Sequence, residues 1–206
     1  MTASRDHIVV FVRAPFLGQV KTRLASETGP ARALEIYRAL TEHVIMVVRS
    51  SGARVIVAHA PADAGLVMRA WLGDDVGYEP QADGDLGARM AAVFASRVAD
   101  GADRVVIVGS DCPTITPETI TSALAALDGA DVVFGPALDG GYYLVAARAL
   151  HAALFRDMPW SSPRTLEVSL TRAREAGLRV ALLTPMRDID TAEDWRAYGE
   201  RLPPLH

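Results

Sequence analysis

The sequence contains one cysteine in 206 residues, which excludes an intrachain disulfide framework. A single thiol is typical of proteins in a reducing compartment, so we expect the chain to be cytoplasmic. Long hydrophobic runs are absent too. The apolar run near the amino terminus has five residues before Arg13, which is too few for a secretory signal. No stretch approaches the roughly 20 apolar residues of a membrane helix, so we expect no membrane span.

A large excess of either charge is also absent. The 21 Lys and Arg residues and the 25 Asp and Glu residues give a formal net charge of −4, which does not favour a nucleic-acid-binding surface. The five histidines show no metal-ligand spacing. The remaining composition is ordinary for a globular protein, with 50% hydrophobic and 22% charged residues. The length suits one α/β domain over residues 1–206, and the sequence does not specify the oligomeric state.

The hydrophobic pattern predicts alternating strands and helices. Only a glycine-rich turn separates the two strands expected at 131–134 and 142–146, so no crossover helix fits and these strands cannot be parallel neighbours. We therefore predict a mixed, mostly parallel sheet with helices on both faces, a three-layer α/β/α fold. Strands are expected at 7–12, 54–59, 76–80, 105–109, 131–134, 142–146 and 179–183, and helices at 30–50, 61–73, 85–101, 150–155 and 162–177, after Thr116, and after Asp190 or Thr191.

Asp111 lies two residues after the apolar strand expected at 105–109. The carboxyl edge of an open α/β sheet is where ligands bind, and Mg²⁺ often uses only one or two carboxylates together with substrate phosphates. We therefore interpret Asp111 as a metal ligand facing a phosphorylated substrate. The alternative is that Asp111 caps a turn that Pro113 fixes. Cys112 is expected to be a small buried residue rather than a nucleophile.

Three cations, Arg13, Lys21 and Arg23, follow the first strand on what reads as one loop. Backbone N–H groups near a helix start, together with cations that reach in, are what phosphate oxygens require. We interpret the three cations as phosphate-binding groups; the alternative is a solvated surface loop. The loop has neither the P-loop pattern nor the GxGxxG dinucleotide pattern.

Two further carboxylates, Asp188 and Asp190, alternate on an extended segment and so could face the same site. Beside Asp111 they would complete a site for a divalent metal. The alternative for Asp190 is that it caps the last helix, with Glu193 at capping-box spacing.

A strand–turn–helix join contains Gln81, Gly84, Asp85, Gly87 and Arg89. The glycines would allow a close backbone approach, and a helix start donates N–H groups, so a nucleotide base or a diphosphate could bind there. An ordinary join with Asp85 as helix cap explains the same residues equally well.

The last candidate group is Asp139, Gly140, Gly141, Tyr143 and Trp160. A turn with two glycines next to tyrosine hydroxyls would admit a sugar or acceptor. A plain hairpin turn is the alternative for the first four residues, and core packing is the alternative for Trp160.

Six ordered blocks carry a resemblance: RAPFLGQVKTRLA, QADGDLGARM, GSDCPTIT, DGGYYLVA, PWSSPRTLE and DIDTAEDW. They resemble a bacterial family of GT-A-type transferases, the selenodomain-associated or arsenosugar-biosynthesis glycosyltransferases. More distantly, the first and last blocks are similar to phospholactate guanylyltransferase and molybdenum-cofactor nucleotidyltransferases. The resemblance implies a nucleotide-diphospho-sugar transferase (GT-A) fold with the nucleotide over the first half of the sheet. It also implies Mg²⁺ or Mn²⁺ on Asp111, with a second metal contact at Asp190.

The chain departs from related families at two points. The GSDCP block offers one aspartate where many glycosyltransferases have a DxD pair, and the first loop has fewer glycines than the corresponding loop of sugar-nucleotide pyrophosphorylases.

The leading functional interpretation is a metal-dependent transferase acting on a nucleotide-linked donor, a GT-A glycosyltransferase that uses a nucleotide sugar, with Lys21 and Asp111 as catalytic residues. One alternative is a nucleotidyltransferase that moves NMP from an NTP to a small phosphorylated acceptor. A second is a non-catalytic nucleotide-binding module, since a fold does not fix a function.

Overall fold

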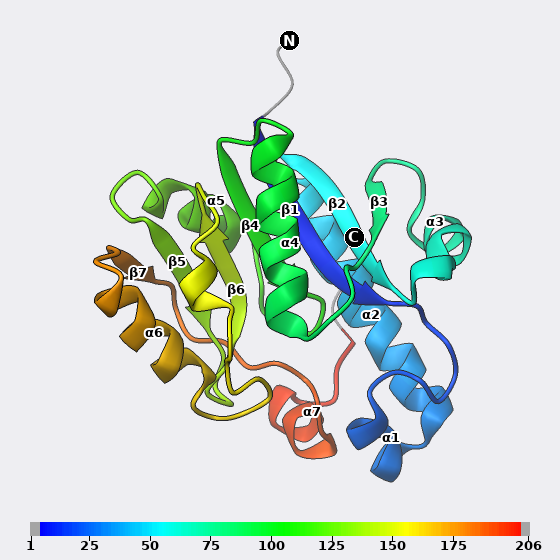
Figure 1. The fold of residues 1–206 in the computed structure, drawn as a ribbon. Coiled ribbons are helices and arrows are strands. Elements are labelled where there is room, and N and C mark those ends of the chain that lie inside the picture. Colours follow the sequence, from blue (N-terminus) through cyan, green and yellow to red (C-terminus); the bar gives the residue numbers. More distant parts are fainter. Residues whose placement is uncertain (1–4, 203–206) are drawn as a thin grey trace.

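The computed structural model describes residues 5–202. These residues form a seven-stranded sheet in the order β3-β2-β1-β4-β6-β5-β7 (Figure 1). The strands are β1 (Asp6–Arg13), β2 (Arg54–Ala60), β3 (Gly77–Pro80), β4 (Arg104–Gly109), β5 (Val132–Pro136), β6 (Tyr142–Ala147) and β7 (Val180–Leu182).

The sheet is mixed, as the sequence predicted. Strands β1, β2, β3 and β4 pair in parallel, and β5 pairs in parallel with β7. Strand β6 alone is antiparallel to its neighbours β4 and β5 among the described strands. The reason is the short β5–β6 connection, which has no room for the helix that a parallel crossover needs.

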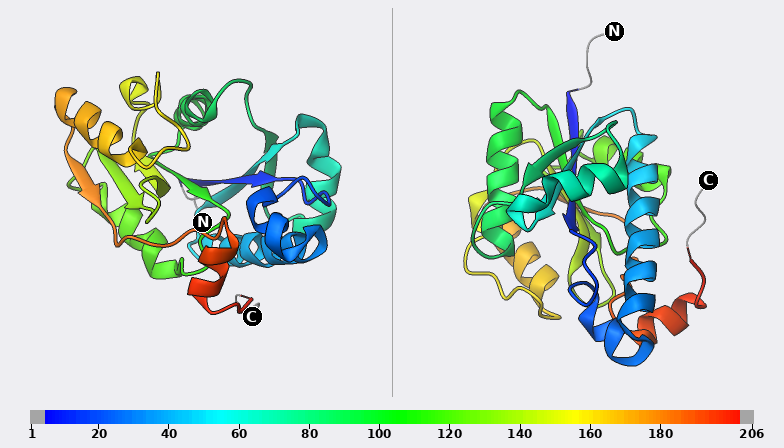
Figure 2. Two further views of the ribbon diagram at one scale, coloured as in Figure 1. Left: turned by 90° about the horizontal axis from the view of Figure 1, so that it is seen from below. Right: turned by 90° about the vertical axis from the view of Figure 1, so that its right-hand side faces the viewer.

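Helices cover both faces of the sheet, which gives the predicted three layers (Figure 2). Helices α2, α3 and α5 pack on one face, and α4, α6 and η2 pack on the other. The helices are α1 (Thr22–Thr28), α2 (Pro30–Arg49), α3 (Gly65–Leu72), α4 (Leu86–Ala99), α5 (Pro117–Ala126), α6 (Thr165–Glu175) and α7 (Ala192–Tyr198), with 3₁₀ turns η1 (Ala62–Ala64) and η2 (Ala152–Leu154). No helix within residues 5–202 combines the length and the apolar character needed to cross a bilayer.

Side chains of the central strands alternate between the two cores. In β4, Val106 and Val108 pack under α2 and α5, whereas Val105 and Ile107 pack under α4. Both sets are almost fully buried, which explains why this strand reads as a continuous apolar run in the sequence. Burial on both faces holds the strand in register and therefore fixes where the residues after Gly109 emerge.

Several predicted helix signals are confirmed. Thr116 caps α5, and Pro117 is its first residue. Gly177 follows α6 with φ +69°, a conformation that glycine adopts without strain. The expected capping box of Asp190 with Glu193 was wrong, because Thr191 caps α7 and its capping-box partner is Asp194.

Three other sequence-based expectations were wrong. Residues 22–28 form helix α1, so Arg23 lies in a helix and not on a loop with Arg13. This short helix forms because Leu24 is buried in a cluster with α2 and α7, a tertiary contact that no local pattern announces. The helical spacing of Leu86, Met90 and Val93 predicts that all three face inward. Met90 and Val93 are buried, but Leu86 is 42% exposed, because it is the first residue of α4. The helix expected from Pro61 or Ala62 begins as the separate turn η1.

Candidate active site

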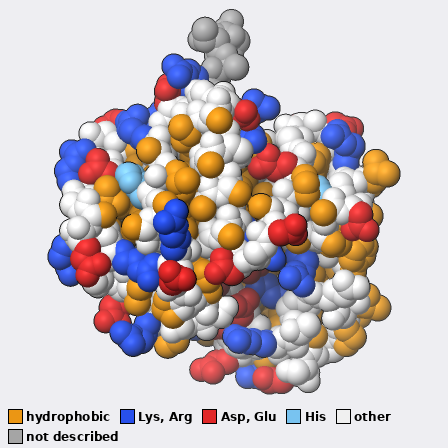
Figure 3. Space-filling view, in the orientation of Figure 1, with side chains coloured by type: hydrophobic (Ala, Val, Ile, Leu, Met, Phe, Trp, Pro, Cys, Tyr) orange, Lys and Arg blue, Asp and Glu red, His pale blue; other side chains and the backbone are white. Residues whose placement is uncertain are grey.

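A cavity of about 550 Å³ opens at the carboxyl ends of the parallel strands. Figure 3 shows this side of the molecule hollowed below α4 and above α1 and α7, with acidic and basic side chains meeting in the hollow. The cavity is lined by Phe11, Val12, Arg13, Gln19, Val20, Lys21, Thr22, Arg23, Tyr37, Gln81, Ser110, Asp111, Ser161 and Asp190. The structure thus brings the predicted cations together with Gln81, Asp111 and Asp190 at the edge where α/β folds bind ligands.

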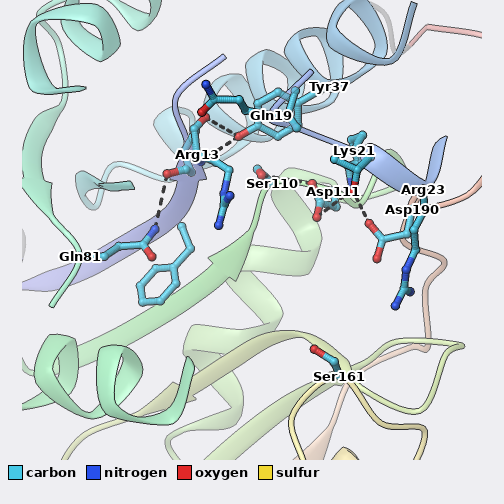
Figure 4. A pocket seen from close by; sticks show the side chains of 14 residues that line it. Arg13, Gln19, Lys21, Arg23, Tyr37, Gln81, Ser110, Asp111, Ser161 and Asp190 are labelled. Atoms are coloured by element: carbon cyan, nitrogen blue, oxygen red, sulfur yellow. Dashed lines mark hydrogen bonds and ion pairs between the residues drawn. The ribbon is translucent and has the colours of Figure 1, made fainter. Parts of the chain in front are cut away.

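Lys21 lies at the centre of this set. Its Nζ is 2.9 Å from Asp111 Oδ2 and 2.6 Å from Asp190 Oδ1 (Figure 4). Asp111 emerges from β4 and Asp190 precedes α7, so one ammonium joins two distant segments of the chain. The Lys21 side chain is 5% exposed, whereas the carboxylates are 36% and 49% exposed and remain open to the cavity.

Burial by itself would lower the pKa of Lys21, because it disfavours the charged form. The negative charges of Asp111 and Asp190 outweigh that effect and raise the pKa above its ordinary value. Lys21 therefore stays protonated at neutral pH. Its backbone is left-handed, with φ 48° and ψ 46°, at the N-cap of α1. This conformation is uncommon for a residue with a side chain, and here it occurs at the residue that joins the two carboxylates.

Arg13 is held by its backbone and not by its side chain. Its N–H donates to the Tyr37 hydroxyl at 2.8 Å, and the same hydroxyl donates to the Arg13 carbonyl at 2.7 Å. The guanidinium is left to point into the cavity, as does that of Arg23 (Figure 4). Within residues 5–202 no carboxylate pairs with either guanidinium. Two unpaired cations beside a cavity are available to bind an anionic ligand.

Gln81 forms the other wall. Its amide nitrogen donates to the Ala58 carbonyl at 2.8 Å, so its Oε1 faces Arg89, which donates to it at 3.2 Å. Asp85 caps α4 by accepting a hydrogen bond from Ala88 N. Arg89 itself does not line the main cavity; its Nε donates to the Gly84 carbonyl.

The two predicted glycines of this join have different roles. Gly84 has φ +106°, which requires glycine. A Cβ on Gly87 would lie 2.0 Å from the Phe155 carbonyl oxygen and 2.8 Å from the Trp160 ring. The close approach at Gly87 is therefore between α4 and the loop that follows η2.

Asp188 is the most buried of the site carboxylates. Burial, followed by the charges of Asp111 and Asp139, raises the pKa of Asp188 to about 7. Its Oδ1 has no hydrogen-bond partner among the described residues. Asp188 lines a smaller cavity of about 150 Å³ together with Asp139 and Asp190.

A divalent metal fits part of this carboxylate set. Asp111 Oδ2 and Asp190 Oδ1 face a common point, which Lys21 Nζ now contacts, and carboxylate oxygens are the ligands that Mg²⁺ and Mn²⁺ prefer. Within residues 5–202, no group of three or more Asp, Glu, His or Cys side chains has metal-site geometry. The observed donor set therefore suits a metal that takes two protein carboxylates and completes its shell with ligand oxygens.

The predicted acceptor residues are spread out. Asp139 Oδ1 accepts from Gly141 N at 2.8 Å, and a Cβ on Gly140 would lie 2.0 Å from the Pro163 carbonyl oxygen, so this turn is fixed tightly against the residues before α6. Tyr143 lies outside the main cavity because its ring packs over Gly135 and its hydroxyl donates to the Thr184 carbonyl.

Trp160 packs edge-on against Tyr142, with ring centroids 6.4 Å apart. Its neighbour Ser161 lines the main cavity instead, with φ 58°.

Sequence reasoning did not single out four polar residues of the cavity, which are Gln19, Thr22, Tyr37 and Ser110. The helical spacing of Tyr37 with Leu40 and Val44 predicts that it lies on the buried stripe of α2. Most of the ring is indeed buried, but the hydroxyl reaches the end of β1. The sequence signal for this role was the tyrosine hydroxyl, a polar group on an otherwise apolar stripe, which needs a hydrogen-bond partner when buried. Ser161 belongs to the stretch Trp160-Ser161-Ser162, which the sequence offers as a possible acceptor platform, and it lines the main cavity. Cys112 is buried, as expected.

Known proteins are similar to this chain in sequence and in architecture. Residues 44–162 match the family described as "Uncharacterized protein conserved in bacteria (DUF2064)". The 2-phospho-L-lactate guanylyltransferase of Haloarcula marismortui is 31% identical over 178 residues, which cover 84% of this chain and 77% of that protein. The solved structure of a candidate nucleotide-diphospho-sugar transferase from Desulfovibrio desulfuricans G20 is 33% identical. It superposes with a TM-score of 0.91 over 95% of this chain and 86% of its own.

A third structure shows the fold alone. A Mycobacterium tuberculosis H37Rv protein crystallised with manganese is 17% identical, with a TM-score of 0.58 over 95% of this chain and 98% of its own.

Together these similarities confirm the predicted nucleotide-diphospho-sugar transferase fold and the expectation that this chain is a transferase. They support the nucleotidyltransferase alternative better than the leading glycosyltransferase interpretation, because the curated relative is a guanylyltransferase. By sequence, fold and the match over residues 44–162, the chain belongs to the DUF2064 family.

Proposed function

We propose that this protein is a nucleotidyltransferase that moves a nucleoside monophosphate from a nucleoside triphosphate to a small phosphorylated acceptor. The observation that carries the proposal is the convergence of Arg13, Lys21 and Arg23 on one cavity, next to Asp111 and Asp190. A triphosphate carries more negative charge than the diphosphate of a nucleotide sugar, so it makes fuller use of three cations. The guanylyltransferase relative supports GTP as the donor.

In the proposed reaction, a phosphate oxygen of the acceptor attacks the α-phosphorus of the triphosphate. The bond from the α-phosphorus to the bridging β-oxygen breaks, and its electron pair leaves with pyrophosphate. The products are pyrophosphate and a nucleoside joined to the acceptor through a diphosphate. Because the chemistry needs no covalent intermediate, the protein contributes by positioning and by stabilising charge.

In this proposal, different cavity residues bind the phosphates, the metal and the acceptor. The Arg13 and Arg23 guanidiniums would hold the β- and γ-phosphates, since nothing in the described chain neutralises them. Asp111 and Asp190 would hold Mg²⁺ or Mn²⁺, which when bound neutralises the charge that develops on the departing pyrophosphate. Lys21 would donate hydrogen bonds to phosphate oxygens once the ligand enters. Asp139 lines the smaller cavity and Ser161 lines the main one, and we place the acceptor in this remaining space.

The test is a pyrophosphate-release assay with each of the four nucleoside triphosphates, Mg²⁺ or Mn²⁺, and a panel of small phosphorylated acids. Release that requires both GTP and one acceptor supports the proposal. The matched control is Asp111→Asn, which keeps the side-chain shape and removes the charge.

A parallel reaction with nucleotide sugars tests glycosyl transfer, which the Desulfovibrio relative's description favours. Nucleoside diphosphate as the released product would replace our proposal with that alternative. Tight nucleotide binding without any product would instead indicate a binding module.

A further inference from the structure

Lys21 is the only lysine in the chain, which otherwise uses 20 arginines for its positive charges. Arginine forms the ion pairs everywhere else in the described part of the protein, from Arg104–Asp6 to Arg196–Glu27. The one ammonium stands where two carboxylates meet. An ammonium is a compact, mobile point charge with three donors, whereas a guanidinium is a planar fork.

The contacts of Lys21 use two of those three donors. Asp111 Oδ2 and Asp190 Oδ1 both lie within hydrogen-bond distance of Nζ, so their charges are compensated by this single group. In the part of the chain that the structure describes, neither carboxylate has another cation within ion-pair distance. The third donor remains for a further acceptor. The Lys21 ammonium thus occupies the point at which these two oxygens would bind a metal.

A divalent cation and an ammonium compete for this point. Both require the same oxygen lone pairs, and two positive centres at hydrogen-bond distance repel each other strongly in a partly buried site. For a metal to take both oxygens, the ammonium must leave. Its side chain is flexible, and the phosphates expected near Arg13 and Arg23 would give it a new partner.

We propose that Lys21 is an internal counterion that keeps metal off the Asp111–Asp190 pair until nucleotide phosphates draw its ammonium away. The inference rests on the proposed function, in that nucleotide and metal share this cavity. Its consequence is that metal and nucleotide bind cooperatively. By linkage, nucleotide raises the affinity for metal by the same factor by which metal raises the affinity for nucleotide.

The experiment is a titration of nucleotide-free protein with Mn²⁺, in which electron paramagnetic resonance measures the free ion. Lys21→Met keeps most of the stem and removes the charge, and it is expected to bind Mn²⁺ about 10- to 100-fold more tightly than the wild type. Arg23→Met removes one nearby charge that contacts no carboxylate, and it should change the affinity less than threefold. The double variant Lys21→Met, Asp111→Asn should lose the tight site.

Two results would overturn the proposal: an unchanged or weaker Mn²⁺ affinity in Lys21→Met, or an equal gain in Arg23→Met, which would indicate a general electrostatic effect. Circular dichroism verifies that each variant is folded. Because these titrations contain no nucleotide and no acceptor, they are independent of whether pyrophosphate is ever released.

A second measurement needs no variant. Since Lys21 is the sole lysine, acetylation by an amine-reactive ester can be followed at one site by mass spectrometry of its peptide. In nucleotide-free protein the buried ammonium should react slowly, and saturating Mn²⁺ should raise the rate several-fold as the ammonium is displaced. A rate that does not change while Mn²⁺ is bound would show that Lys21 and the metal do not compete.

Discussion

Charged side chains are paired differently at the two ends of the sheet. At the amino ends of the parallel strands, two arginines each pair with a carboxylate of their own. Arg104 pairs with Asp6 through two hydrogen bonds of 2.7 Å, and Arg179 pairs with Asp131 in the same manner. At the carboxyl ends, one lysine serves two carboxylates, while nearby Arg13 and Arg23 have none.

The difference separates structure from function. Paired charges at the amino ends link neighbouring strands, β1 to β4 and β5 to β7. Because these charges neutralise each other, they attract a charged ligand only weakly. Charge at the carboxyl ends is arranged around a cavity and is incompletely matched, as a binding site for a charged ligand requires. Substitutions at the two ends should therefore affect different measurements.

The largest effect is expected for Asp111→Asn. Loss of this charge should lower pyrophosphate release about 10³-fold, because the variant loses a carboxylate at the point where charge develops. The protein should still fold, with a lowered thermal midpoint, because Asp190 remains as a partner of the buried Lys21 ammonium. Asp131→Asn is the matched control at the other end of the sheet and should keep turnover within twofold.

Lys21→Arg should lower kcat/KM about 10²-fold although the charge is kept. A planar guanidinium cannot take the place of an ammonium in contact with both Asp111 and Asp190, and small misplacements of binding groups are costly. Steady-state kinetics with saturating metal measure the effect. Activity within threefold of the wild type would mean that only the charge of Lys21 matters.

Tyr37→Phe tests whether the Tyr37 hydroxyl positions Arg13 for nucleotide binding. The hydroxyl both accepts from and donates to the Arg13 backbone, and its removal leaves that N–H without its partner. We expect the KM for the nucleotide to rise about fivefold and the unfolding free energy to fall by about 1 kcal/mol. A loss of stability with an unchanged KM would limit Tyr37 to a structural role.

Most of the fold could be predicted from the sequence, because it depends on short-range patterns. Strand β4 is apolar on both faces, and Thr116-Pro117 is a strong local signal for a helix start. Helix α1 was missed because its formation depends on Leu24 meeting Ile36 and Trp195, residues that are distant in sequence.

Several residues of the candidate site could be predicted from the sequence, but the contacts between them could not. Arg13, Lys21, Asp111 and Asp190 follow strands or precede helices at one edge of the sheet, so topology brings them together. That Lys21 bonds to Asp190, 169 positions away, depends on the exact path of the chain before α7. The sequence also left open which residue caps α7, and only the cap at Thr191 leaves Asp190 to face the cavity.

Arg104→Met tests the role of the paired charges at the amino ends of the strands. It removes the bidentate, half-buried pair with Asp6 and should lower the unfolding free energy by about 1–3 kcal/mol, since hydrogen bonds to charged groups are the stronger ones. Urea titrations measure the loss, and pyrophosphate release should stay within twofold of the wild type. Loss of activity in a folded Arg104→Met protein would contradict the division between the two ends.

The smallest effect concerns the pH dependence of the Arg179–Asp131 pair. Side-chain and backbone hydrogen bonds from Arg179 lower the pKa of Asp131 to about 2 from an ordinary value of 3.8. The folded state thus favours the ionised carboxylate, so its contribution to stability is fully present above pH 3.8 and disappears as the pH falls through about 2. In urea titrations between pH 5 and pH 2, the difference between wild type and Asp131→Asn should shrink with acid. The difference itself should be small, because exposed ion pairs contribute little to stability. A difference that stays constant with pH would mean that the pair contributes through packing and not through charge.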